Sequence, residues 1–177
     1  SQFCIEDLID NLDKASLEFI YNESLGFAEM YLNGVNVEKL IRSLEVSNLV
    51  SKVSAIPEVR RKLVAIQKEI GKNKAVVMDG RDIGTVVFTD AELKIFMTSS
   101  AETRAQRRFD ELIQKGEKVS YKEVYTNVVE RDRVDTTRKD SPLIKAESAI
   151  EIDNSELSKE KQFEIILKLV EEKLRDI

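Results

Sequence analysis

The first part of the chain carries strand-like hydrophobic patterning. Residues 17–21 alternate between hydrophobic and polar, residues 27–32 are strand-like, and Asn33-Gly34 follows directly. Alternation with a period of two is typical of a β-strand, and Asn-Gly suits a tight hairpin turn because both residues tolerate a positive φ. We therefore expect a small antiparallel unit near the start.

The pattern then changes to helical spacing. Hydrophobic residues recur three and four positions apart over residues 46–55 and 59–70, as on one face of a helix. Pro57 can open the second helix, since a first turn does not need its missing N–H, and Gly71 can close it. We predict two consecutive helices.

Capping boxes, each a serine followed three residues later by a glutamate, mark the start of two further helices. The pairs are Ser99 with Glu102 and Ser120 with Glu123. The first of these helices should run to about Gln114, with Gly116 in the left-handed position just past its end. A last amphipathic helix is expected over residues 159–174.

Short apolar runs lie between these helices. They occupy residues 75–78, 93–97 and 149–152. Such runs, ending in polar turns, are expected of strands in a mostly parallel sheet, and we expect the first two to be buried on both faces. The alternation of strands and helices predicts an α/β core.

Composition narrows the available chemistry. The chain has 177 residues, is 42% hydrophobic, and contains Cys4 as its one cysteine and no histidine. Disulfides, thiolate-and-imidazole zinc sites and Ser-His-Asp hydrolases are therefore excluded. No apolar stretch suits a membrane span or an export signal, so we expect a cytoplasmic protein. The net charge of −5 argues against a broad nucleic-acid surface, and we expect neither nucleic acid nor membrane as a partner.

The loop over residues 78–85 concentrates two carboxylates, a guanidinium and two glycines after an apolar run. Ligands of open α/β sheets bind at such carboxyl ends of strands. Arg81 could hold a phosphate by a two-pronged hydrogen bond, and Asp82 could accept from the exocyclic amine of cytosine, where uracil offers an oxygen. The alternative is a hairpin with Arg81 and Asp82 as a solvated pair, because Asp-Gly also favours a turn.

Seven of the eleven arginines fall between Arg81 and Arg138. Phosphoryl transfer depends mainly on positioning and charge neutralisation, which converging guanidinium groups would supply. Ordinary surface ion pairs are the alternative, because helical spacing of four residues would allow them. The pairs with this spacing are Arg107 with Glu111 and Arg131 with Asp135.

Taken in order, these segments resemble bacterial cytidylate kinases from about Tyr31 to the end. The ten residues 79–88 are the most specific match. The other matching elements are Leu32-Asn33-Gly34 before a helix ending at Ile41-Arg42, residues 51–60, Arg104 to Arg108, and Arg-Asp-x-x-Asp-x-x-Arg from Arg131 to Arg138.

The resemblance implies transfer of the γ-phosphoryl group of ATP to cytidine monophosphate (CMP), and to dCMP, in pyrimidine metabolism. Mg²⁺ would accompany ATP, with no protein metal ligand identifiable. It also implies a P-loop-kinase-like fold, in which a mostly parallel sheet is flanked by helices and carries a small antiparallel insertion. Residues 1–73 would form the nucleoside-monophosphate-binding region, and residues 74–177 the core α/β domain with a lid at about 117–144.

Site residues follow from the same resemblance. The positions around the pyrimidine base are Ser51, Arg60, Asp82 and Arg138. Arg81 matches a phosphate contact, while Arg131 and Asp135 match positions near the ribose and phosphates. The expected catalytic residues are Arg81, Arg131 and Arg138. Arg107 and Arg108 match lid or donor-side positions. Without the resemblance, Ser51 would be interpreted as a helix-surface hydroxyl and Arg60 as a solvated cation.

The glycine-rich loop that grips the phosphate donor in this family is not found in the sequence. Family members carry a first strand and a Gly-x-x-x-x-Gly-Lys-Ser/Thr loop, whereas the one Gly-Lys pair here is Gly71-Lys72. We expect little or no kinase activity from these 177 residues alone, because the donor phosphates would lack their cradle. A complete protein should be a monomer, but loss of a central strand would expose sheet edges and permit swapping or association.

Two other functions stay open. One is a kinase of the same architecture that acts on uridine or adenosine monophosphate. The other is a non-catalytic nucleotide-binding or interaction module. A preference for uridine or adenosine monophosphate over CMP would distinguish the other kinase from a cytidylate kinase. The presence of a donor loop would distinguish a kinase from the non-catalytic module.

Overall fold

The computed structural model describes residues 4–73 and 75–175, apart from the side chains of Leu44, Ser51 and Asn73. The chain has a mixed α/β fold that divides into two compact units, residues 1–66 and 67–177. The division falls within helix α3, Pro57–Ile70.

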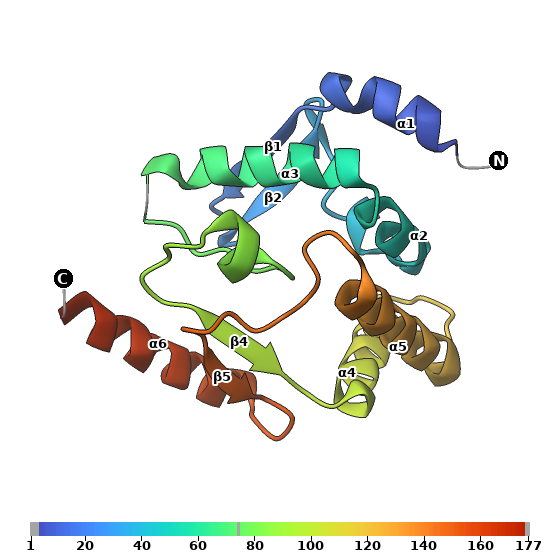
Figure 1. Ribbon diagram of the computed structural model, residues 1–177. Helices are drawn as coiled ribbons and strands as arrows, with labels where there is room; N and C mark the ends of the chain where they lie inside the picture. The colour runs from blue at the N-terminus through green and yellow to red at the C-terminus, as the bar shows by residue number, and fades with distance from the viewer. Residues whose placement is uncertain (1–3, 74, 176–177) are drawn as a thin grey trace. The chain divides into compact units, whose positions relative to one another are not determined.

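The first unit is built around a small antiparallel sheet (Figure 1). Its elements, besides most of α3, are α1 (Ile5–Asn11), η1 (Leu12–Lys14), β1 (Leu17–Asn22), β2 (Phe27–Leu32), β3 (Val35–Asn36), η2 (Leu40–Arg42) and α2 (Leu44–Ser54). β2 lies between β1 and β3 and is antiparallel to both. Asn33 and Gly34 link β2 to β3 with φ of 50° and 76°. The predicted antiparallel unit and its Asn-Gly turn are confirmed.

Helices α2 and α3, which follow this sheet, begin in different ways. Ser43 caps α2, because its hydroxyl accepts from the backbone N–H of Val46. Pro57 is the first residue of α3, as predicted. The helix expected to end at Ile41-Arg42 is instead the single 3₁₀ turn η2.

The second unit alternates helices with a small parallel sheet. Its elements after α3 are η3 (Gly71–Asn73), η4 (Ile83–Val87), β4 (Ile95–Thr98), α4 (Ala101–Gln114), α5 (Tyr121–Thr137), β5 (Ile150–Asp153) and α6 (Lys159–Arg175). β4 and β5 pair in parallel, with Ile95 opposite Ile150 and Thr98 opposite Asp153. These are the strands predicted at 93–97 and 149–152, shifted by one or two residues.

The strand predicted over residues 75–78 is wrong. This segment has no regular secondary structure, and Val77 is fully exposed (102%) instead of buried on both faces. A strand needs a neighbour to pair its N–H and C=O groups. No described strand pairs with residues 75–78, so apolar composition alone does not make them a strand.

Gly71 closes helix α3 as predicted, since the helix ends at Ile70. It begins the 3₁₀ turn η3, and it is not among the glycines with positive φ. A Cβ at this position would collide with the ring of Phe88. The glycine therefore permits a close approach of the Phe88 ring rather than a left-handed cap.

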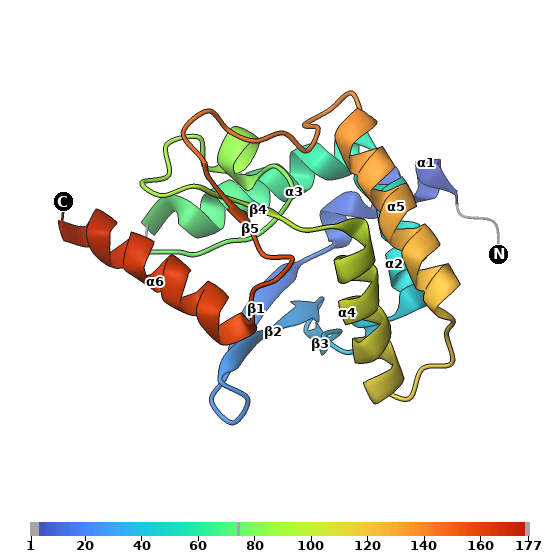
Figure 2. The same ribbon diagram turned by 90° about the horizontal axis from the view of Figure 1, so that it is seen from below.

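Helices α4 and α5 lie side by side (Figures 1 and 2). The capping box of α5 is confirmed, since Ser120 and Glu123 exchange both bonds. In α4 the cap is Ser100, whose hydroxyl accepts from the Thr103 N–H, and not Ser99 as predicted. Gly116 has φ +80°, as expected past the helix end. The apolar residues buried in these two helices are Ala105, Leu112 and Val124.

Among residues 4–73 and 75–175, none of the helices combines the length and apolar character that crossing a bilayer would require.

Candidate functional site

The loop after residues 75–78 turns tightly around Asp82. The Asp82 carbonyl accepts from the backbone N–H of Val86 at 2.9 Å and from the hydroxyl of Thr85 at 3.3 Å. The residue as a whole is 9% exposed. The alternative of a hairpin between two strands is wrong, because the loop leads into the single helical turn η4. Asp82 is therefore buried and is not half of a solvated surface pair.

Asp135, on the last turn of α5, receives two guanidinium groups. Arg138 Nη1 donates to Asp135 Oδ1 at 2.9 Å, and Arg81 Nε lies 3.0 Å from Oδ2. The second approach has the distance of an ion pair, but its angle does not meet hydrogen-bond geometry. The side chains of Asp135 and Arg138 are only 5% and 6% exposed. Because a buried carboxylate is costly unless paired, this pairing fixes the loop arginine beside α5.

Arg138 also holds the turn that follows α5. Its Nε donates to the Ser141 carbonyl at 2.8 Å, and Ser141 has φ +50°. The Leu143 N–H donates to the Asp135 carbonyl at 2.7 Å. Side chain and main chain of Asp135 thus both hold the turn that returns toward β5.

Arg131 has a different environment from the other arginines of α5. Within the described part of the chain its guanidinium forms no hydrogen bond and no ion pair. The pKa of its guanidinium is lowered, first because burial removes water from the charged form and then because Arg81 repels it. Asp135 partly offsets this, and Arg108 adds further repulsion. The Arg131 guanidinium therefore lies near two like charges and has no ion-pair partner of its own among the described residues, as expected of a site for an anion.

Arg104 and Asp132 join α4 to α5. Arg104 Nη1 and Nη2 donate to the two carboxylate oxygens of Asp132 at 2.7 and 2.6 Å, and Arg104 Nε donates to the Ser99 carbonyl. The Asp132 bonds raise the pKa of Arg104. Neither residue was predicted to have a role of its own. They are 28 positions apart, and no local pattern pairs them.

Arg107 donates to the segment that follows β5. Its guanidinium bonds the side-chain oxygen of Asn154 at 3.1 Å and the Asn154 carbonyl at 2.7 Å. It also reaches the carbonyls of Ser155 and Leu157. The guanidinium therefore ties α4 to residues 154–157.

The two ion pairs anticipated at helical spacing do not form. Glu111 pairs with Arg108, at 2.9 Å, and with Lys115, which does most to lower its pKa; Arg107 is engaged elsewhere. Asp135 pairs with Arg138 and Arg81 rather than with Arg131. Glu111 instead pairs with two other residues at helical spacing, Arg108 and Lys115. Asp135 pairs with the nearby Arg138 and with Arg81 from the distant loop.

Two predicted base-side residues belong to the first unit. Arg60 is half-buried and donates from Nη1 to the Ser54 carbonyl at 3.1 Å, near the end of α2. It is therefore not a fully solvated cation. Ser51 lies in α2, but its side chain is outside the described residues.

The described residues contain no group of three or more Asp, Glu, Cys or His side chains placed to hold a metal ion.

A family model for cytidylate kinases matches residues 2–172. The chain belongs to the cytidylate kinase family. Similar proteins include the cytidylate kinases of Flavobacterium johnsoniae, 69% identical over 165 residues, and Flavobacterium psychrophilum, 66% identical over 165 residues. The matches cover 93% of this chain and 72% and 73% of those relatives. The cytidylate kinase of Parabacteroides distasonis is 53% identical over 157 residues, covering 89% of this chain and 69% of the relative.

Family membership fits the chemistry of the second unit. A member of the cytidylate kinase family must bind a phosphorylated substrate, and the region around Arg131 offers clustered guanidinium groups beside a buried carboxylate. Such groups bind phosphate oxygens through charge-assisted hydrogen bonds. The cluster is the strongest candidate for the phosphate-binding part of the site.

Proposed function

We propose that this chain carries the acceptor side of an enzyme that transfers the γ-phosphoryl group of ATP to CMP, and to dCMP, giving the diphosphate and ADP. The observation that carries the proposal is the arrangement of Arg81, Arg131 and Asp135 in a member of the cytidylate kinase family. Phosphoryl transfer needs charge neutralisation more than covalent chemistry. A group of buried and half-buried guanidiniums supplies it.

Arg81 and Arg131 are the proposed ligands of the acceptor phosphate. Burial and the repulsion between them leave Arg131 short of negative charge, so a phosphate dianion would relieve both effects. Arg138 is the third proposed catalytic arginine, by its match to a family position around the pyrimidine base. Asp135 holds Arg81 and Arg138 in position, and a place near the ribose and phosphates is proposed for it by its match to a family position.

Asp82 is the proposed reader of cytosine. A buried carboxylate can accept from the exocyclic amine of cytosine, whereas the oxygen of uracil would face it with like polarity. Base-side roles are also proposed for Ser51, Arg60 and Arg138, by their match to family positions.

Fewer residues can be proposed for the ATP-binding side of the site. Arg107 and Arg108 are proposed near ATP, which would enter with Mg²⁺ as co-substrate, and residues 117–144 as a lid. The contacts of Arg107 with residues 154–157 support a structural role as well. A P-loop-kinase-like fold would place a further strand and a glycine-lysine loop beside the parallel sheet. The printed sequence contains no Gly-x-x-x-x-Gly-Lys segment, so we propose that these 177 residues alone turn over little or no CMP.

Calorimetric titration of the 177-residue chain with CMP, UMP and AMP tests the proposal. We expect CMP to bind at least about tenfold more tightly than UMP, because one well-placed base contact discriminates by roughly 1–3 kcal/mol. Preference for UMP or AMP would overturn the assignment of Asp82 and indicate a different nucleotide. Absence of heat with all three nucleotides would overturn the acceptor site itself. A coupled assay with ATP and CMP checks the expected lack of turnover.

A further inference from the structure

The charge balance around Arg131 depends on the position of one carboxylate. Arg81 and Arg108 both repel the Arg131 guanidinium, and Arg131 has no hydrogen-bond or ion-pair partner within residues 4–73 and 75–175. Asp132 follows directly in sequence and is close enough to act on the charge of Arg131. If the Asp132 carboxylate turned toward this cluster, it would compete with an incoming phosphate.

Arg104 prevents that competition by its geometry. It binds both oxygens of the Asp132 carboxylate, at 2.7 and 2.6 Å, in a two-pronged pair. Its third donor, Nε, is bound to the Ser99 carbonyl just past β4. The Ser99 carbonyl thus fixes the planar guanidinium after β4, while the other two nitrogens hold the Asp132 carboxylate on α5. About a third of each side chain is exposed, at 35% for Arg104 and 32% for Asp132.

We propose that Arg104 is a positioning residue for the acceptor phosphate: it occupies the Asp132 carboxylate and so keeps that carboxylate away from the Arg81 and Arg131 guanidiniums, the proposed phosphate ligands. This inference rests on the proposed function. It adds a residue pair that touches neither phosphate nor base. Arg104 acts by holding the Asp132 carboxylate. The carboxylate then stays out of the anion site and does not compete with the phosphate.

A purely structural clamp between α4 and α5 would behave differently. Loss of a clamp loosens the helix pair whether or not the partner is charged, so removing the second member cannot restore ligand binding. If Arg104 instead neutralises a competing carboxylate, removing that carboxylate restores binding even though the clamp is absent. The double variant therefore separates the two roles.

The experiment compares three variants by calorimetry with CMP and, as a base-free probe, inorganic phosphate. For Arg104→Gln we expect CMP affinity to fall about tenfold, because a freed carboxylate lies among the phosphate ligands. Asp132→Asn should bind CMP as tightly as the parent or more tightly. Arg104→Gln combined with Asp132→Asn should return to within about threefold of the parent. Arg104→Lys, which keeps the charge but not the fork, should lie between parent and Arg104→Gln.

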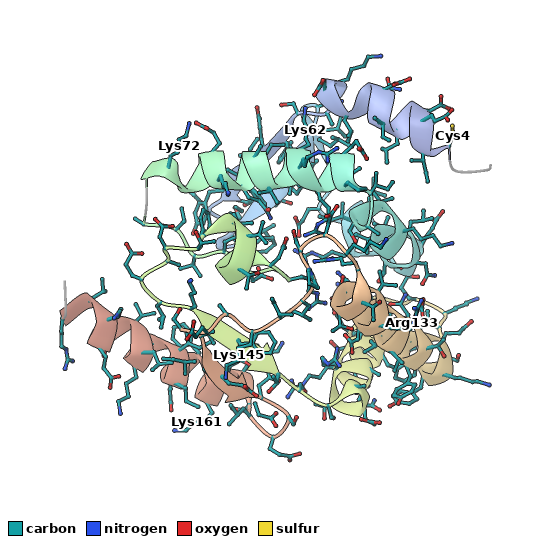
Figure 3. The ribbon with its side chains drawn as sticks, viewed as in Figure 1. Cys4, Lys62, Lys72, Arg133, Lys145 and Lys161 are labelled. Carbon is teal, nitrogen blue, oxygen red and sulfur yellow. The ribbon has the colours of Figure 1, made fainter. Side chains whose placement is uncertain are left out.

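Controls keep the outcomes distinct. Arg133→Ala removes a neighbouring arginine on α5 (Figure 3), one that pairs with Glu130, and should leave CMP affinity unchanged. Parent-like CMP binding by Arg104→Gln, or a double variant as weak as Arg104→Gln, would overturn the inference. A parent chain that does not bind CMP would overturn the proposed function, while the phosphate titration would still test Arg104.

Discussion

Two arginine-rich regions of the second unit use the same side chain in opposite ways. At the start of α4, Arg104 and Arg107 donate to a carboxylate and to carbonyl oxygens of residues 154–157. At the end of α5 and the facing loop, Arg131 lies near Arg81 with no bonded partner of its own among the described residues. The guanidinium donors of the first region are bonded to other residues of the chain, whereas Arg131 in the second region retains donors for a ligand.

The number of arginines in a region therefore does not distinguish structural arginines from ligand-binding ones. An engaged guanidinium stabilises the fold by about 1 kcal/mol per bond, less where it is exposed. A guanidinium held beside like charges and removed from water costs stability instead. Arg131 fits the second description, and such a cost is typical of residues that meet a ligand. Substitutions in the two regions should therefore produce opposite patterns of stability and affinity.

The largest effect should come from Arg131→Ala. We expect CMP affinity to fall about a hundredfold, since a charge-assisted contact to phosphate is worth roughly 1.5–3 kcal/mol. The thermal midpoint should stay the same or rise, because a half-buried cation near two like charges is removed. Calorimetry and thermal unfolding measure both quantities. A lower midpoint with unchanged CMP affinity would place Arg131 among the structural arginines.

Asp82→Ala should have an intermediate effect limited to the base. We expect CMP affinity to fall about tenfold, while affinity for inorganic phosphate is unchanged because Arg81 is retained. Titration with CMP, UMP and phosphate measures this split. The matched control is Asp79→Ala, which removes an exposed carboxylate from the same loop. Equal CMP affinity in Asp82→Ala and the parent would contradict the base-reading role.

Arg107→Ala should have the smallest effect, on stability rather than binding. Loss of its bonds to Asn154 and the following carbonyls should lower the free energy of unfolding by about 1 kcal/mol. CMP affinity should not change. Denaturant unfolding and calorimetry test this, with Gln106→Ala on the exposed side of α4 as the control. If Arg107→Ala unfolded like the parent and weakened ATP binding in a chain supplied with a donor loop, the donor-side assignment would be favoured instead.

Features that depend on near neighbours in sequence could be predicted. The Asn33-Gly34 turn, the Ser120 capping box and the left-handed Gly116 follow from local backbone chemistry, and the structure confirms all three. The wrong cap at Ser99 has the same local character. Two serines compete there, and the hydroxyl of Ser100 has the geometry to accept from the Thr103 N–H.

Features that depend on distant partners were the ones missed. Residues 75–78 have the composition of a buried strand, but no described strand supplies the opposite edge. Arg107 and Arg131 have carboxylates at helical spacing, yet Arg107 bonds residues 154–157 and Asp135 pairs with Arg81 and Arg138. Spacing gives the set of possible partners, and packing selects among them.

The sequence alone determined the mixed α/β class, most helix and strand positions, and membership of a kinase family through the run from Asp79 to Phe88. Turns, caps and hydrophobic periodicity are set within a few residues, so they can be inferred without the fold. Only the tertiary structure decided which arginines are engaged. The strength of an ion pair depends on distance, burial and competing donors from other elements, and none of these is encoded at a fixed spacing along the chain.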